Sequence, residues 1–167
     1  DRLAFHGKWY MADTFFFFSP GTQYEYSNTG TTLAAYIIER ATGEPFDVFT
    51  QKHILTPLQL KDSGWKFDAI DLSRLSRYYQ NPKTLLPYYS MSSYPDGGFM
   101  TTINDLSKYL QELIRGYNGK GTILSKESYR EFFKPQLSAE HFTERNTQNP
   151  YSESYNTCLL YTSPSPR

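Results

Sequence analysis

The stretch that most constrains this chain runs over residues 20–43, where turn residues lead into an amphipathic helix. Pro20-Gly21 predicts a turn before the helix. Over residues 31–42 apolar side chains recur at helical spacing and predict a single apolar stripe, formed by Leu33, Ala34, Ile37, Ile38 and Ala41. Gly43 is placed to end the helix. The sequence therefore predicts one well-bounded helix close to its beginning.

Three further helices and a hairpin follow in the sequence. Pro45 suits the first turn of a second helix, which should end before Pro57. Residues 75–79 and 85–89 predict two short strands, joined by a turn at residues 81–84. Thr102 predicts the N-cap of a helix whose buried face is marked by Ile103, Leu106, Leu110, Leu113 and Ile114. Ser125 caps a last short helix with Tyr129, Phe132 and Phe133 facing inward.

Charge and composition exclude several classes of partner. The chain has 167 residues with 17 basic and 17 acidic side chains, so its formal net charge is zero. A neutral chain gives no electrostatic reason to bind nucleic acid or an anionic membrane. The apolar run at residues 15–18 is four phenylalanines long, far too short to span a membrane, and we expect a buried strand or core plug there.

Metal and cofactor chemistry have no support in the sequence. His6, His53 and His141 are isolated from one another, and Cys158 is the sole cysteine. Cys158 lies in a tail, residues 158–167, that resembles a translated sequencing adapter, so we exclude it from fold prediction. We expect residues 1–157 to form a single partial domain, without a disulfide, metal or cofactor.

Tyr26 and Asn28 are the candidate functional residues, because they lie at the start of the first helix. A tyrosine and an asparagine two residues apart there can direct a phenol and an amide into one cleft. The structural alternative is that Tyr26 is a buried aromatic residue and Asn28 is the N-cap of the helix. A cleft mouth formed by Asp96, Tyr88, Tyr89 and Tyr94 is a further candidate, and an ordinary loop is the alternative.

Several segments in consistent order over residues 14–137 resemble the serine β-lactamase-related family. Tyr26-Ser27-Asn28 is similar to its second motif, and residues 54–58 to its Ile-x-x-Pro-Leu-Gly-Met segment, with Gln59-Leu60 where Gly-Met is usual. Residues 97–106 are similar to its Gly-Gly-x-x-Ser/Thr-Thr-x-x-Asp-Leu stretch. The family contains class C β-lactamases, D-alanyl-D-alanine carboxypeptidases and related esterases. The resemblance implies an α+β fold of the β-lactamase/transpeptidase type, represented here mostly by its helical region with a few short strands.

The resemblance also implies a function for the parent protein. It would be a serine hydrolase that forms an acyl-enzyme on a small-molecule or peptide substrate, namely a β-lactam, a D-Ala peptide or an ester. Tyr26 would relay the serine proton, and Asn28 would bind the substrate and hold a lysine. A periplasmic or extracellular location is implied as well. The oligomeric state is not indicated.

Two family motifs have no counterpart at the expected places. The nucleophile's Ser-x-x-Lys should lie upstream of Tyr26, and a Lys/His-x-Gly motif should lie downstream. The Ser-x-x-Lys at Ser63–Lys66 lies in a turn-rich segment and is interpreted as a coincidence. We therefore expect an internal fragment that is inactive by itself. A non-catalytic, aromatic-rich module that binds glycans or peptides is the alternative.

Overall fold

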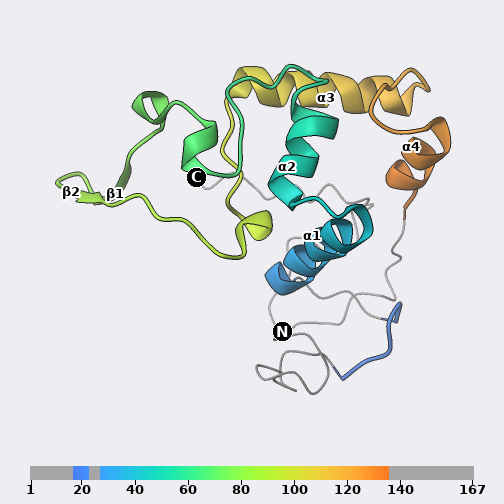
Figure 1. Ribbon diagram of the computed structural model, residues 1–167, viewed down its shortest axis with the longest axis horizontal. Helices are drawn as coiled ribbons and strands as arrows, with labels where there is room; N and C mark the ends of the chain where they lie inside the picture. The colour runs from blue at the N-terminus through green and yellow to red at the C-terminus, as the bar shows by residue number, and fades with distance from the viewer. Residues whose placement is uncertain (1–16, 23–26, 136–167) are drawn as a thin grey trace, which may run out of the picture. The chain divides into compact units, whose positions relative to one another are not determined.

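The structure is a computed structural model that describes residues 17–22 and 27–135 (Figure 1). Contacts divide the chain into two units, Tyr26–Lys134 and the remainder. In the remainder, the backbone N–H of Thr22 donates to the carbonyl of Ser19 at 3.2 Å, which confirms the predicted turn. Phe17 is fully exposed, so the expectation of a buried phenylalanine run is wrong at this residue. Phe15 and Phe16 lie outside the described residues.

Helix α1 (Asn28–Thr42) opens the larger unit and begins earlier than the predicted residue 31. Gly43 ends the helix with a φ of 74°, and its N–H donates to the Glu39 carbonyl at 2.8 Å. Glycine suits this left-handed C-cap because it has no Cβ. The stripe predicted for α1 is largely exposed: Ile37 is 58% exposed, whereas Ala35 is the buried residue of the helix.

The next elements run from the second helix to the hairpin. Helix α2 (Phe46–Thr50) follows Pro45 and continues as a π-helical stretch, η2 (Gln51–Leu55), which stops before Pro57 as predicted. Two 3₁₀ turns, η3 (Phe67–Ala69) and η4 (Leu72–Arg74), lead to strands β1 (Tyr78–Asn81) and β2 (Thr84–Leu86). The strands pair antiparallel, with Tyr78 opposite Leu86, which confirms the predicted hairpin, although its strands cover residues 78–81 and 84–86 instead of 75–79 and 85–89. Figure 1 shows the hairpin projecting away from the helices.

The last elements are a 3₁₀ turn and two helices. Turn η5 (Tyr94–Asp96) contacts α1, and helix α3 (Ile103–Tyr117) contacts α4 (Lys126–Phe133). Thr102 and Ser125 cap α3 and α4 through their hydroxyl groups, as predicted. Tyr129 is buried, whereas Phe132 and Phe133 are half-buried. Helices and one two-stranded sheet in the described residues confirm an α+β fragment dominated by helices.

The predicted buried face of α3 is wrong except at one residue. Leu113 is buried, but the remaining four predicted residues are exposed: Ile103, Leu106, Leu110 and Ile114. Two carboxylates, Asp105 and Glu112, are buried instead. The reason is that each carboxylate accepts hydrogen bonds from segments outside α3, which holds the face that carries Asp105, Glu112 and Leu113 toward the rest of the unit.

The carboxylate of Asp105 is the more central of the two. It is 1% exposed, and its Oδ2 accepts hydrogen bonds from the Asp62 N–H at 2.7 Å and the Ser63 hydroxyl at 2.9 Å. Its Oδ1 accepts from Lys108 Nζ at 2.8 Å. Burial raises the pKa of Asp105, but these donors lower it by more, so its pKa lies below the usual value. The ionised carboxylate therefore holds Asp62 and Ser63 against α3.

Beside Asp105, two backbone hydrogen bonds close a long excursion of the chain. Gly64 and Met100 exchange N–H···O bonds of 2.9 Å each, so residues 64–100 leave and return at one neck. The Ser63 and Thr101 hydroxyls lie 2.8 Å apart just outside this bridge. The neck fixes where the excursion starts and ends relative to α3.

Glu112 organises the C-terminal part of α3 and the loop that follows. Its Oε1 accepts from the backbone N–H groups of Thr122 and Ile123 and from the Tyr129 hydroxyl at 2.7 Å. Burial, and then the adjacent carboxylate, raise the pKa of Tyr129 to about 12. A Cβ at Gly116 or Gly121 would meet the Tyr129 ring at 2.3 or 2.2 Å. Gly116 near the end of α3 and Gly121 in the following loop thus make room for this ring.

Gln59 occupies a backbone conformation that favours glycine. Its φ is 56°, in the turn between the buried residues Leu55 and Leu60. The Leu60 N–H donates to the Leu55 carbonyl at 2.8 Å across this turn. A left-handed backbone costs an L-residue about 1–2 kcal/mol because its Cβ approaches the following carbonyl oxygen. This geometry explains why Gly is usual at the corresponding place in the similar segment.

We expect Gln59→Gly to stabilise the fold by about 1 kcal/mol, because glycine adopts this φ without strain. This gain is larger than the extra backbone entropy that glycine loses on folding. The measurement is urea unfolding followed by tryptophan fluorescence. Gln59→Ala is the control, since it removes the same side chain but keeps the Cβ. An equal gain from Gln59→Ala would show that strain is not the cause.

We expect Asp105→Asn to destabilise the fold by about 2–3 kcal/mol, because an amide replaces an acceptor oxygen among three donors. Since the folded pKa is below the unfolded value of about 3.9, the carboxylate's contribution is fully present above that value and is lost as pH falls through the folded pKa. The difference between wild type and Asp105→Asn should therefore shrink below about pH 4. Urea unfolding at several pH values measures it.

The matched control for Asp105→Asn is Asp68→Asn, which changes an exposed carboxylate. Its unfolding midpoint should stay close to that of the wild type. A loss at Asp105 that does not change between pH 7 and pH 3 would contradict the role of the ionised carboxylate.

Candidate active site

The start of α1 carries the candidate residue Asn28. Ser27 is the N-cap, with extended φ of −147°, and its hydroxyl accepts a hydrogen bond from the Gly30 N–H at 3.0 Å. Asn28 is the first residue of the helix and is exposed. The alternative in which Asn28 itself caps the helix is therefore wrong. Tyr26 lies outside the described residues.

The helix face that carries Asn28 lies beside turn η5. Thr32 follows Asn28 by one helical turn, so both lie on the same face of α1. The Thr32 hydroxyl donates to Asp96 Oδ2 at 3.4 Å, and α1 contacts η5. Asn28 is thereby placed on the side of α1 that faces Tyr94 and the residues following it.

Asp47 of α2 forms an ion pair with Lys66 and hydrogen bonds with Tyr94 of η5. Lys66 Nζ lies 2.5 Å from Asp47 Oδ2. The Tyr94 hydroxyl accepts from the Asp47 N–H at 3.1 Å and donates to its Oδ1 at 3.3 Å. Lys66 Nζ also lies 5.8 Å from the centre of the Tyr94 ring. The hydrogen bonds hold the hydroxyl end of Tyr94 against α2, and Lys66 lies over its ring.

The protonation states of this cluster follow from its contacts. Burial raises the pKa of Asp47, but the hydrogen bond and charge of Lys66 lower it more, so the carboxyl stays ionised at neutral pH. The same hydrogen bond raises the pKa of Lys66 above its usual value. Burial is the main cause that raises the pKa of Tyr94. Tyr94 is thus a neutral hydrogen-bonding partner, without the lowered pKa that a catalytic base needs.

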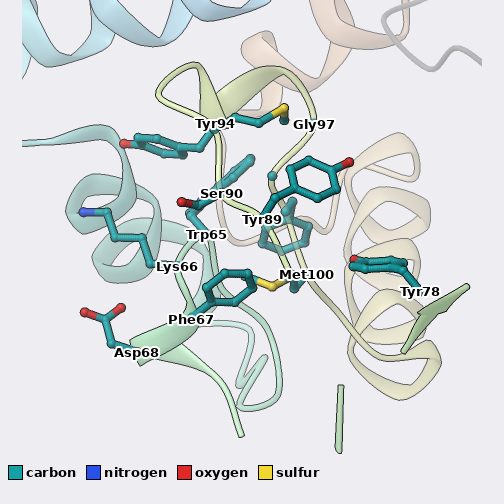
Figure 2. Close-up of a pocket in the computed structure, with 13 residues that line it drawn as sticks. Trp65, Lys66, Phe67, Asp68, Tyr78, Tyr89, Ser90, Tyr94, Gly97 and Met100 are labelled. Carbon is teal, nitrogen blue, oxygen red and sulfur yellow. The ribbon is translucent and has the colours of Figure 1, made fainter. Parts of the chain in front are cut away.

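An aromatic pocket of about 510 Å³ lies within the excursion of residues 64–100 (Figure 2). Its lining includes the aromatic side chains of Trp65, Phe67, Tyr78, Tyr89, Tyr94 and Phe99. Figure 2 shows Lys66 and Asp68 extending to one side, with the rings of Tyr78 and Tyr89 on the other.

Two of the four residues proposed for a cleft mouth line the aromatic pocket. Tyr89 and Tyr94 do so, whereas Tyr88 packs its ring 5.9 Å from Phe67 and donates its hydroxyl to the Leu75 carbonyl at 3.1 Å. Asp96 is instead the acceptor for α1, as described above. The segment is therefore more than an ordinary loop at Tyr89 and Tyr94, which line the pocket, whereas Tyr88 and Asp96 do not line it.

Sequence reasoning missed the other aromatic lining residues. Trp65 and Phe99 lie far apart in the chain, and their rings meet at 4.7 Å because the Gly64–Met100 bridge joins the segments that carry them. No periodicity connects these positions. The one available signal was the density of aromatic residues between two turn-rich segments.

The Ser-x-x-Lys at Ser63 and Lys66 does not form a nucleophile pair in the described structure. Ser63 is 3% exposed and its hydroxyl bonds to Asp105 and Thr101, whereas Lys66 pairs with Asp47. Each group is thus committed to a different structural contact, so neither can activate the other.

The described residues also bear on metals and membranes. Among them, no group of three or more His, Cys, Asp or Glu side chains is arranged to hold a metal ion. His53 packs its ring 4.5 Å from Phe49 and lies 3.9 Å from Glu44, as a surface residue. Of the helices within residues 17–22 and 27–135, none has the length and apolarity needed to cross a bilayer.

Comparison with known proteins gives a family for most of the chain. The family model described as Beta-lactamase matches residues 9–157. A curated relative, the mouse "Serine beta-lactamase-like protein LACTB, mitochondrial", is 34% identical over 110 residues. That alignment covers 60% of this chain and 19% of the relative, so the chain spans about a fifth of that protein's length.

Solved structures give the same relationship. The octameric penicillin-binding protein homologue from Pyrococcus abyssi matches with a TM-score of 0.56 and 25% identity, over 71% of this chain and 27% of that one. The D-amino acid amidase from Ochrobactrum anthropi, complexed with L-phenylalanine amide, matches with a TM-score of 0.53 and 26% identity, over 66% of this chain and 33% of that one. The family match, the relatives and the fold of the described residues agree, and the chain belongs to the serine β-lactamase-related family.

Proposed function

We propose that the protein containing this chain is a serine hydrolase that transfers an acyl group from an amide or ester to a serine and then to water. The observation that carries the proposal is the family match over residues 9–157. The names of the similar proteins, a penicillin-binding protein homologue and a D-amino acid amidase, favour an amide bond in a small molecule or short peptide. In this proposal the serine, its lysine and the Lys/His-x-Gly motif come from parts of the protein outside these residues.

Tyr26 is the proposed proton relay. A tyrosine with the ordinary pKa of about 10 is a weak base near neutral pH. A neighbouring lysine ammonium would stabilise its phenolate, so that the phenol could accept the serine proton during acylation. The proton would pass to the leaving amine or alcohol when the scissile bond breaks. In deacylation the proton transfers would run in reverse: Tyr26 would take a proton from the attacking water and return it to the serine.

Asn28 is the proposed substrate-binding residue. Its amide offers donors and an acceptor, which suits the amide group of a substrate and a lysine ammonium at the same time. The Ser27 cap fixes the first turn of α1, and Asn28 lies exposed in that turn. On the same face of α1, the Thr32 hydroxyl donates a hydrogen bond to Asp96. These features support a position at the edge of a cleft.

We expect Tyr26→Phe to lower kcat/KM of the longer protein by about 10²–10⁴-fold, because loss of a positioned proton-transfer group typically has that effect. The measurement is hydrolysis of a chromogenic cephalosporin, a p-nitrophenyl ester and an amino acid p-nitroanilide. Tyr36→Phe is the matched control, since Tyr36 is an exposed tyrosine on α1. Equal activity of wild type and Tyr26→Phe would contradict the relay.

The aromatic pocket also fits the second hypothesis, a non-catalytic binding module. Such a module would bind ligands without forming a covalent bond to serine. A fluorophosphonate or penicillin probe separates the two hypotheses, because a serine hydrolase is labelled and a binding module is not. Absence of labelling in the longer protein would favour the module.

A further inference from the structure

The aromatic pocket has the size and composition of a site for a small organic ligand. Its volume of about 510 Å³ lies within the range of about 300–1,000 Å³ that is common for ligand pockets. Two methionines, Met91 and Met100, add polarisable side chains to the aromatic lining. Tyr89 is 69% exposed, although the contact of its ring with the Tyr78 ring at 6.3 Å holds it beside the pocket.

The polar groups of three lining residues, Trp65, Tyr94 and Lys66, are already committed to other contacts. Trp65 Nε1 donates to the Thr50 hydroxyl at 2.8 Å, and the Tyr94 hydroxyl exchanges hydrogen bonds with Asp47. Lys66 is paired with the same aspartate. What Trp65 and Tyr94 offer a ligand is therefore the surface of their rings rather than a donor or acceptor.

The ring geometry favours another aromatic group over an aliphatic one. Trp65 meets Tyr94 at 5.8 Å in an edge-on arrangement and Phe99 at 4.7 Å in a tilted one. Rings at such separations and tilts attract one another through their quadrupoles, in addition to burial of apolar area. A ligand ring between Tyr89 and this cluster would extend the same pattern.

The charges at the pocket favour a neutral ligand. Lys66 and Asp68 are the charged residues in the described lining, and their charges are opposite. Figure 2 shows both on the side away from Tyr78 and Tyr89. A cation held over the rings would have no carboxylate beside Tyr89 to neutralise it.

We propose that the aromatic pocket binds a neutral aromatic group, such as the side chain of a phenylalanine derivative. Turn η5 connects the pocket to the start of α1, because Tyr94 and Gly97 line the pocket and Asp96 bonds to Thr32. The pocket would then select substrates with an aromatic group, and this second statement rests on the proposed function. The binding statement is independent of it.

Binding is tested with the whole 167-residue chain and three probes that share one backbone. They are the N-acetyl amides of phenylalanine, cyclohexylalanine and lysine. The chain has two tryptophans, so Trp9→Phe leaves the indole N–H signal of Trp65 as the NMR reporter. We expect the phenylalanine amide to shift this signal and to bind about 2–10-fold more tightly than the cyclohexylalanine amide.

Variants on and off the pocket locate the binding site. Tyr89→Ala should weaken binding of the phenylalanine amide by about 2–10-fold, whereas Tyr89→Phe should preserve it because the ring remains. Tyr79→Ala is the matched control: Tyr79 is an exposed tyrosine of β1 that is not part of the pocket lining. Tyr89 is largely exposed, so its removal should leave the fold intact.

Several results would overturn the inference. These are an unchanged Trp65 signal, equal binding of the cyclohexylalanine amide, tighter binding of the lysine amide, or equal effects of Tyr89→Ala and Tyr79→Ala. In the longer protein, turnover without preference for aromatic over alanine p-nitroanilides would contradict the selection of substrates. Binding without any turnover would contradict the proposed function and leave the binding inference standing.

Discussion

The fold of the described residues depends on the buried carboxylate of Asp105. A carboxylate that is almost completely removed from water is stable only when donors surround it, and Asp62, Ser63 and Lys108 supply them. These contacts bring the segment before Gly64 onto α3, where the Gly64–Met100 bridge forms. The aromatic pocket lies within the excursion closed by that bridge, so one ionised group in a helix supports the geometry of a site built elsewhere.

Local features of the fold could be predicted from the sequence, because they depend on nearby residues. The caps at Thr102 and Ser125, the stop at Gly43 and the β1–β2 turn all follow from side-chain and backbone chemistry within a few positions. The orientation of α3 could not be predicted in this way. Its apolar periodicity is real, but most of the donors that hold Asp105 and Glu112 come from segments outside the helix, before it for Asp105 and after it for Glu112.

The candidate site shows the same division. A short motif predicts Asn28 at the start of α1, and Asn28 lies there in the structure. The pocket's rings come together through tertiary contacts instead: Trp65 reaches Phe99 only because the chain is closed at its neck. Gln59 could be predicted in part. The sequence shows that it replaces the glycine usual in the similar segment, but only the structure shows its φ of 56°.

The exposure of the β1–β2 hairpin has a consequence for how such a protein can diversify. Every residue of both strands is exposed, and yet Tyr78 of β1 lines the pocket. Substitutions at exposed positions away from caps and buried contacts usually change stability little. Tyr78, where the hairpin reaches the pocket, can therefore change in shape and chemistry while the neck and α3 stay as they are. New ligand preferences can arise there without first endangering the fold.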